Sequence, residues 1–199
     1  MGMGYVNGGS NGYPHLAISH QNRHRNGRER SSQKPDSRDH TIRLEQKVTI
    51  ADREAIPTLQ PEWRRLIGDC ERACQKRSLR DGAHSTSLEV LRNRPELIGL
   101  SSDPFAVFVE PTFNGGEGPE PDLVFVYLER GEVFVVEYKC GYREGEFRKQ
   151  LTRAIDHFQA GYGITPRGIY CYPIVDGEVF EWGTLARDNG SVLLVPHRR

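Results

Sequence analysis

The chain has 199 residues, of which 36% are hydrophobic and 27% charged, and it carries 27 basic and 27 acidic side chains. This length suits one domain of ordinary size with some excess, and it excludes two full domains. The formal charge of zero excludes a global basic field of the kind that attracts nucleic acids.

Charge is nevertheless distributed unevenly along the chain. Residues 1–100 have a net charge of +5, whereas residues 101–199 have a net charge of −5. The segment 101–140 alone contains eight acidic and two basic side chains. Such a concentration of carboxylates is suited to a bound cation, although a solvated acidic surface gives the same pattern.

Residues 1–40 contain only eight apolar side chains, together with six glycines and four of the seven histidines. Burial of so few apolar groups cannot offset the entropy lost on ordering. We therefore predict a disordered, mildly basic tail, extended by a linker to residue 55, and one domain over residues 56–199. The basic cluster over residues 23–30 is suited to phosphate contact, with a plain solvated linker as the alternative.

Apolar runs and cysteines indicate the cellular environment. The chain has no run of 18 apolar residues and no secretory pattern near its N-terminus, so we expect a soluble, intracellular protein without a membrane span. The four cysteines match neither a disulfide framework nor a complete zinc site, which predicts reduced thiols. Cys70 and Cys74 have helical spacing, and we expect them to be small core residues rather than half of a metal site.

The domain begins with two predicted helices. Apolar residues recur at spacings of three and four over residues 61–79, which predicts the first helix. The second helix is shorter, with Ser85 or Ser87 as its N-cap and Pro95 as its terminator.

The pattern then changes to short segments rich in valine and aromatic residues, separated by turn residues. Strands are predicted over residues 105–109, 123–128, 133–138, 168–173, 179–182 and 192–195. One helix is predicted over residues 145–160, between the third and fourth of these strands. The order is helix, strand, strand, strand, helix, strand, followed by a C-terminal strand pair. This order predicts an α/β fold with a central mixed sheet flanked by helices.

Three charged side chains interrupt two of these apolar strands. Asp122 precedes one strand, and Glu137 and Lys139 end the next. A hairpin loop of two or four residues around Arg130 places Asp122 opposite Lys139 and diagonal to Glu137, with all three on one face. Burial of these groups is unfavourable unless something compensates, and one divalent cation could bridge the two carboxylates. The alternative is an ordinary exposed Glu-x-Lys pair beside an unrelated turn.

Asp122 after a proline, followed by Glu137-Tyr138-Lys139 on the next strand, resembles the motif of the PD-(D/E)XK nuclease superfamily. This superfamily includes restriction endonucleases, Holliday junction resolvases and RecB-type exonucleases, and the element order over residues 85–175 also resembles its core. The resemblance implies a restriction endonuclease-like fold with catalytic Asp122, Glu137 and Lys139. It further implies Mg²⁺ or Mn²⁺ bound by Asp122, Glu137 and the backbone carbonyl of Tyr138, with Lys139 orienting or deprotonating the attacking water.

The helix predicted after the motif has a polar flank beside its apolar stripe. Lys149, Gln150, Arg153 and His157 share this flank, which borders the buried side and can reach the charged strand ends. A glutamine followed by leucine at this place is frequent in the superfamily, and Gln150 is similar. We expect Lys149, Gln150 and Arg153 to contact nucleic acid, whereas Lys149 and Arg153 taken alone fit a solvated basic surface equally well.

A further metal ligand is expected on the first core helix, because the superfamily often has a glutamate there. Glu89 is the best candidate, with Glu62, Glu71 and Glu110 as alternatives. His84 offers another ligand, because cap-snatching viral RNA endonucleases of this fold place a histidine on a helix for this purpose. A single histidine at a helix start is more often a cap or a surface residue. The cysteine pattern departs from that of iron–sulfur members, so no cluster is expected.

The sequence therefore predicts a metal-dependent nuclease that hydrolyses phosphodiester bonds, with DNA favoured over RNA and endonuclease action favoured over other modes. Two alternatives stay open: an RNA endonuclease of the cap-snatching type, and a nuclease-like module that binds nucleic acid or a protein without cleavage. The intact set of Asp122, Glu137 and Lys139 argues against the second. Many relatives in the superfamily act as homodimers, but no dimer seam is readable in this sequence.

Overall fold

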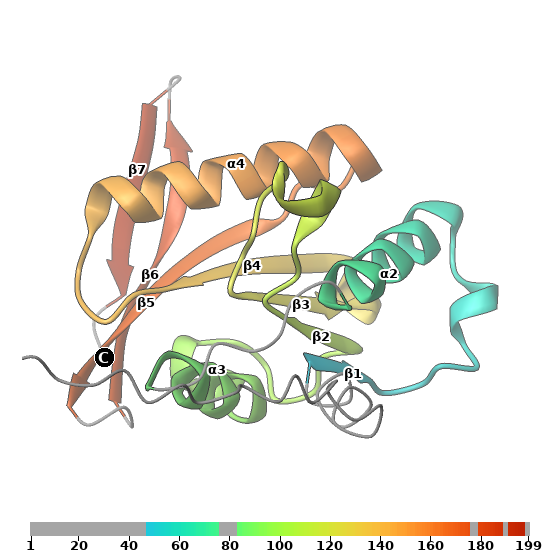
Figure 1. The fold of residues 1–199 in the computed structure, drawn as a ribbon, viewed down its shortest axis with the longest axis horizontal. Coiled ribbons are helices and arrows are strands. Elements are labelled where there is room, and N and C mark those ends of the chain that lie inside the picture. The colour runs from blue at the N-terminus through green and yellow to red at the C-terminus, as the bar shows by residue number, and fades with distance from the viewer. Residues whose placement is uncertain (1–46, 76–82, 176–178, 189–190, 198–199) are drawn as a thin grey trace, which may run out of the picture. The chain divides into compact units, whose positions relative to one another are not determined.

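The computed structural model describes residues 47–75, 83–175, 179–188 and 191–197 (Figure 1). In this part of the chain, a seven-stranded mixed sheet is flanked by three α-helices, which confirms the predicted α/β class. No helix there has both the length and the hydropathy needed to cross a bilayer. The predicted tail over residues 1–40 lies outside the described residues.

The sheet follows the chain, so that each strand lies beside the next one in sequence. Neighbouring strands are antiparallel except β4 and β5, which are paired in parallel and are connected in sequence by helix α4. The strands are β1 (Val48–Ile50), β2 (Ala106–Val109), β3 (Leu123–Tyr127), β4 (Glu132–Tyr138), β5 (Arg167–Val175), β6 (Val179–Asp188) and β7 (Ser191–His197).

The three helices cover both faces of the sheet. Helices α2 (Pro61–Cys74) and α4 (Glu144–Tyr162) pack on one face, and α3 (Ala83–Asn93) packs on the other (Figure 1). The apolar stripes predicted for α2 and α4 supply the side chains that these helices bury.

Strands β3 and β4 lie at the centre and are buried on both faces. Val124 and Val135 join the core under α2 and α4, whereas Phe125 and Phe134 join the core under α3. This alternation follows from the period of two along a strand. It also explains why both strands read as almost continuous apolar runs.

The elements appear in the predicted order, but several ends differ. Helix α3 begins at Ala83, so Ser85 and Ser87 lie inside the helix and the prediction of a serine cap is wrong. The predicted extension of α2 to residue 79 falls outside the described residues. Strand β1 was not predicted and lies within the expected linker, because three residues carry no periodic signal and pairing with β2 alone defines this strand.

The hairpin of β3 and β4 has a different register from the predicted one. Tyr127 pairs with Glu132, so the loop comprises residues 128–131 and the pairing is shifted by two residues. Continued to the strand ends, this register places Asp122 opposite Glu137 rather than opposite Lys139. A shift of two keeps every side chain on its predicted face. The two carboxylates therefore still share a face and are direct rather than diagonal neighbours.

Candidate active site

Asp122 immediately precedes β3 and is only 8% exposed. Its backbone N–H donates to the carbonyl of Val136 at 3.1 Å, which ties this residue to β4. Its Oδ2 accepts a hydrogen bond from the backbone N–H of Tyr138 at 2.7 Å. These contacts hold the carboxylate between the two central strands.

Glu137 is the next-to-last residue of β4 and is 2% exposed. Its carboxylate forms an ion pair with the ammonium group of Lys139, whose side chain is 20% exposed. Burial and the neighbouring Asp122 carboxylate raise the pKa of Glu137, and Lys139 opposes this by favouring the charged form. Two adjacent buried carboxylates are energetically unfavourable, so this pair requires positive charge.

A third carboxylate comes from Glu110, which directly follows β2. Its backbone N–H donates to the carbonyl of Asp122 at 2.8 Å. Its φ of +46° lies in the left-handed region, which is uncommon for residues other than glycine and is often found at functional sites. The side chain is buried, and its Oε2 has no hydrogen-bond partner.

His84 approaches this group from the first turn of α3. Its Nε2 lies 3.3 Å from Asp122 Oδ1 and 3.7 Å from Glu110 Oε1. Although these distances are short, Nε2 is buried and has no partner with hydrogen-bond geometry. The imidazole also meets the ring of Tyr138 edge-on, with 5.3 Å between centroids.

Ser87 is a contributor that sequence reasoning missed, because it was considered only as a helix cap. Its hydroxyl donates to the phenol oxygen of Tyr138 at 3.0 Å. This bond joins α3 to β4 and helps to fix the helix face that carries His84. No sequence pattern could have identified this contact, since it depends on how α3 is rotated against the sheet.

Glu89 is not brought into this cluster. It is exposed on α3, about 200° around the helix from the buried Ser87. Glu62 and Glu71 lie on α2 at the other face of the sheet, and Glu71 is ion-paired with Arg53 at 2.7 Å. Of the four glutamates considered as a further ligand, only Glu110 lies beside Asp122.

The cluster suits a divalent cation in its chemistry. Carboxylate and carbonyl oxygens are the ligands that Mg²⁺ and Mn²⁺ prefer. The buried Glu110 Oε2 and His84 Nε2 both lack partners, so they offer ligand atoms without breaking existing bonds. Within the described ranges, no group of three or more His, Cys, Asp or Glu side chains is already placed to hold a metal ion. Lys139 contacts only Oε1 of Glu137, so the carboxylate could also contact a cation.

A cavity of about 260 Å³ opens beside Glu137 and is lined by Gln150 and Arg153 of α4 and by residues of the segment 116–121. Arg153 also donates to a backbone carbonyl in this segment, that of Glu117. Lys149 is exposed on the same helix, outside the residues that line the cavity. Two of the three predicted nucleic-acid contacts therefore face the same space as Glu137, and contact with nucleic acid stays a prediction for all three.

Comparisons with protein-family models, curated proteins and solved structures find no match for this chain. Its function must therefore be inferred from the chemistry of the cluster. Carboxylate oxygens that can bind a cation, an ammonium group beside them and an arginine facing the adjoining cavity form a set suited to a phosphate ester.

Proposed function

We propose that this protein is a Mg²⁺- or Mn²⁺-dependent nuclease of the PD-(D/E)XK type. The observation that carries the proposal is the pair of buried carboxylates, Asp122 and Glu137, on adjacent strands, with the ammonium group of Lys139 in contact with Glu137. Burying two carboxylates side by side does not stabilise a fold. Their position at the end of two apolar strands is therefore best explained by a function.

The order of the elements supports the same proposal. Helix α3, strands β2, β3 and β4, helix α4 and strand β5 follow one another as in a restriction endonuclease-like core. Asp122 immediately precedes the second strand of this series, Glu137 belongs to the third, and Gln150 belongs to the helix that follows. These are the places that the superfamily resemblance implies for the metal-binding and substrate-contacting residues.

Asp122, Glu137 and the backbone carbonyl of Tyr138 would hold the cation, with Glu110 and His84 as further ligands. When bound, the cation would supply positive charge against the scissile phosphate. Lys139 would orient the attacking water, whose oxygen forms the new bond to phosphorus while the ester P–O bond breaks. The proton of the water passes to a base, a role open to Lys139 only as the neutral amine, and the leaving oxygen takes up a proton.

DNA is the favoured substrate, and one observation supports RNA as a second candidate. His84, on α3, lies against Asp122 and Glu110, and cap-snatching RNA endonucleases of this fold place a histidine on a helix as a metal ligand. The positions of Gln150 and Arg153 beside the cavity are compatible with either backbone.

Incubation of the purified chain with linear, circular, branched and single-stranded DNA, and with RNA, tests the proposal. We expect cleavage with Mg²⁺ or Mn²⁺ and none with EDTA. Asp122→Ala and Glu137→Ala are expected to abolish cleavage and retain the fold by circular dichroism, because each removes a cation ligand. Glu129→Ala, at an exposed position in the β3–β4 loop, is the matched control and should remain active. Full activity in either ligand variant would overturn the proposal.

A further inference from the structure

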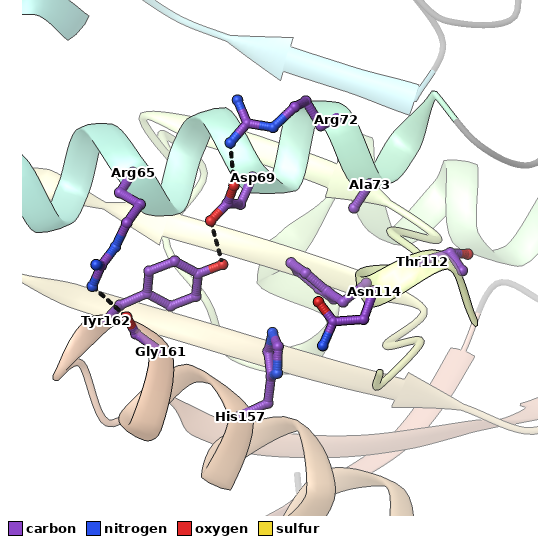
Figure 2. Close-up of a pocket in the computed structure, with 10 residues that line it drawn as sticks. Arg65, Asp69, Arg72, Ala73, Thr112, Asn114, His157, Gly161 and Tyr162 are labelled. Carbon is purple, nitrogen blue, oxygen red and sulfur yellow. Dashed lines mark hydrogen bonds and ion pairs between the residues drawn. The ribbon is translucent and has the colours of Figure 1, made fainter. Parts of the chain in front are cut away.

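A second cavity, of about 360 Å³, lies between α2, α4 and the short turn η3 (Phe113–Gly116). Its volume is in the range typical of small-ligand sites. Figure 2 shows Arg65 and Asp69 reaching from α2 towards Gly161 and Tyr162 of α4. None of these residues belongs to the carboxylate cluster.

The polar side chains of this cavity are held in place by contacts with one another. Asp69 accepts hydrogen bonds from the Tyr162 hydroxyl, at 3.0 Å, and from Arg72. Arg65 donates to the carbonyl of Gly161, and its guanidinium lies 5.4 Å from the centroid of the Tyr162 ring. Two guanidinium groups against one carboxylate make the rim positively charged, as a phosphate ligand requires.

An aromatic wall, whose two rings are tilted by 50° to each other, lines another part of the cavity. The rings of Phe113 and His157 are 4.9 Å apart between centroids. Burial lowers the pKa of His157, which favours the uncharged imidazole. Beside this wall, Asn114 is exposed at the cavity with φ +48°, and its amide offers both a donor and an acceptor. Aromatic faces next to an amide are the groups that bind an unpaired nucleobase.

The two cavities lie along the same helix, α4. Arg153 lines the first cavity and His157 the second, one turn and about 6 Å further along the helix axis. The connecting segment 113–121 contributes to both cavities, with Asn114 in the second and residues 116–121 at the first. A strand that passes Glu137 along α4 would therefore reach the second cavity next.

We propose that this second cavity binds one unpaired nucleotide of the substrate strand, next to the segment that lies at Glu137. The base packs against His157 and Phe113 with its polar edge at Asn114, and its phosphate lies at Arg65. This subsite rests on the proposed nuclease function and narrows it to substrates with a single-stranded segment beside the cleaved bond.

Gly161→Trp is the main test, because the position lines the cavity and a Cβ there would meet no heavy atom within 4 Å. The indole can therefore occupy the cavity without displacing the fold. Gln159→Trp is the matched control, exposed on the same helix about 200° away. The probe is a fluorescein-labelled single-stranded DNA of about 12 nucleotides, titrated in EDTA so that no cleavage occurs. We expect Gly161→Trp to weaken binding at least about fivefold, the loss typical of one stacked base, and the control to bind like the wild type.

Asn114→Gly provides a second variant, since glycine keeps the left-handed backbone and removes only the amide. It should bind the same probe more weakly and with less preference among oligonucleotides of different base. Wild-type affinity in both variants, or no binding of the probe by the wild type, would overturn the subsite. Failure of the nuclease is separable, because it appears as binding in EDTA without cleavage in Mg²⁺. Cleavage in Mg²⁺ by the wild type, together with wild-type affinity in both variants, would reject the subsite alone.

Discussion

Glu137→Gln separates the energetic cost of the carboxylate pair from its function. The substitution keeps the volume of a side chain that is 2% exposed and removes one of two adjacent buried charges. Its amide can also donate a hydrogen bond to Asp122, which an ionised carboxylate cannot do. We therefore expect the variant to be inactive and yet more stable than the wild type when no cation is present.

The magnitude follows from the groups around Glu137. Burial and Asp122 both disfavour the charged form, whereas the contact with Lys139 favours it. Replacement of a whole buried ion pair by well-packed apolar groups is often neutral or stabilising by about 1–4 kcal/mol, whereas removal of one partner is unfavourable when the other stays buried. Lys139 loses its partner, but it is partly exposed and can turn towards water, so only part of that gain is lost. We expect a rise in unfolding free energy of about 1–2 kcal/mol, or about 2–8 °C in Tm.

Urea unfolding followed by the fluorescence of Trp63 and Trp182 measures this difference. In EDTA, Glu137→Gln should unfold at higher urea than the wild type, and Glu129→Gln should stay within about 0.5 kcal/mol of it. Mg²⁺ at about 100 times its Kd should stabilise the wild type by about 2.7 kcal/mol and the Glu137 variant by much less. A destabilised variant in EDTA, or equal stabilisation of both chains by Mg²⁺, would refute the reasoning.

Three further predictions address the role of Lys139 in catalysis, the binding of substrate phosphates and the burial of the cysteine thiols. Lys139→Ala should lower the turnover number by about 10²–10⁴ with little change in calorimetric Mg²⁺ affinity; a loss of affinity as large as in Asp122→Ala would contradict its role. Replacing Lys149 and Arg153 together by alanine should flatten the salt dependence of duplex binding by about 0.9 per lost contact, and an unchanged slope would leave both residues as a solvated surface. Only Cys140 should react rapidly with a chromogenic disulfide in the native protein, because the other three thiols are buried and burial raises their pKa values; a second fast thiol would argue against the described core.

The helix after the motif shows what periodicity can predict. The sequence indicated a helix over residues 145–160, and α4 spans Glu144–Tyr162 with Phe147, Leu151 and Phe158 buried. A long apolar stripe of this spacing indicates a helix, because only a helix places all of these side chains on one face. The central strands were predictable for a related reason, because their apolar runs are bounded by turn residues.

The hairpin register could not be predicted to the residue. Leu128 has the side chain of a strand residue, yet it begins the short helical turn that leads into the left-handed Gly131. Either assignment gives a loop of even length. The face of Asp122 was therefore predictable, while its direct partner was not, because parity fixes the face and turn geometry fixes the register.

Two of the glutamates considered as further metal ligands, Glu89 and Glu110, differ in what the sequence indicates about them. Leu88 and Leu91 define the buried side of α3, and Glu89 falls away from it at 100° per residue, so its exposure could have been predicted. Glu110 is different. It is hydrogen-bonded to the backbone of Asp122 and adopts a positive φ, which no sequence pattern indicates for a glutamate.

The site breaks the rule of local consistency at one place, the charged ends of β3 and β4, and natural proteins break it mainly where they function. Asp122 is held there by backbone hydrogen bonds, whereas Lys139 is more exposed and is held mainly by Glu137. Under the proposed function, a cation that takes the place of Lys139 on Glu137 would release the ammonium group towards the water it is to orient. The ion pair that compensates for buried charge before metal binding would then also keep Lys139 beside the reaction centre.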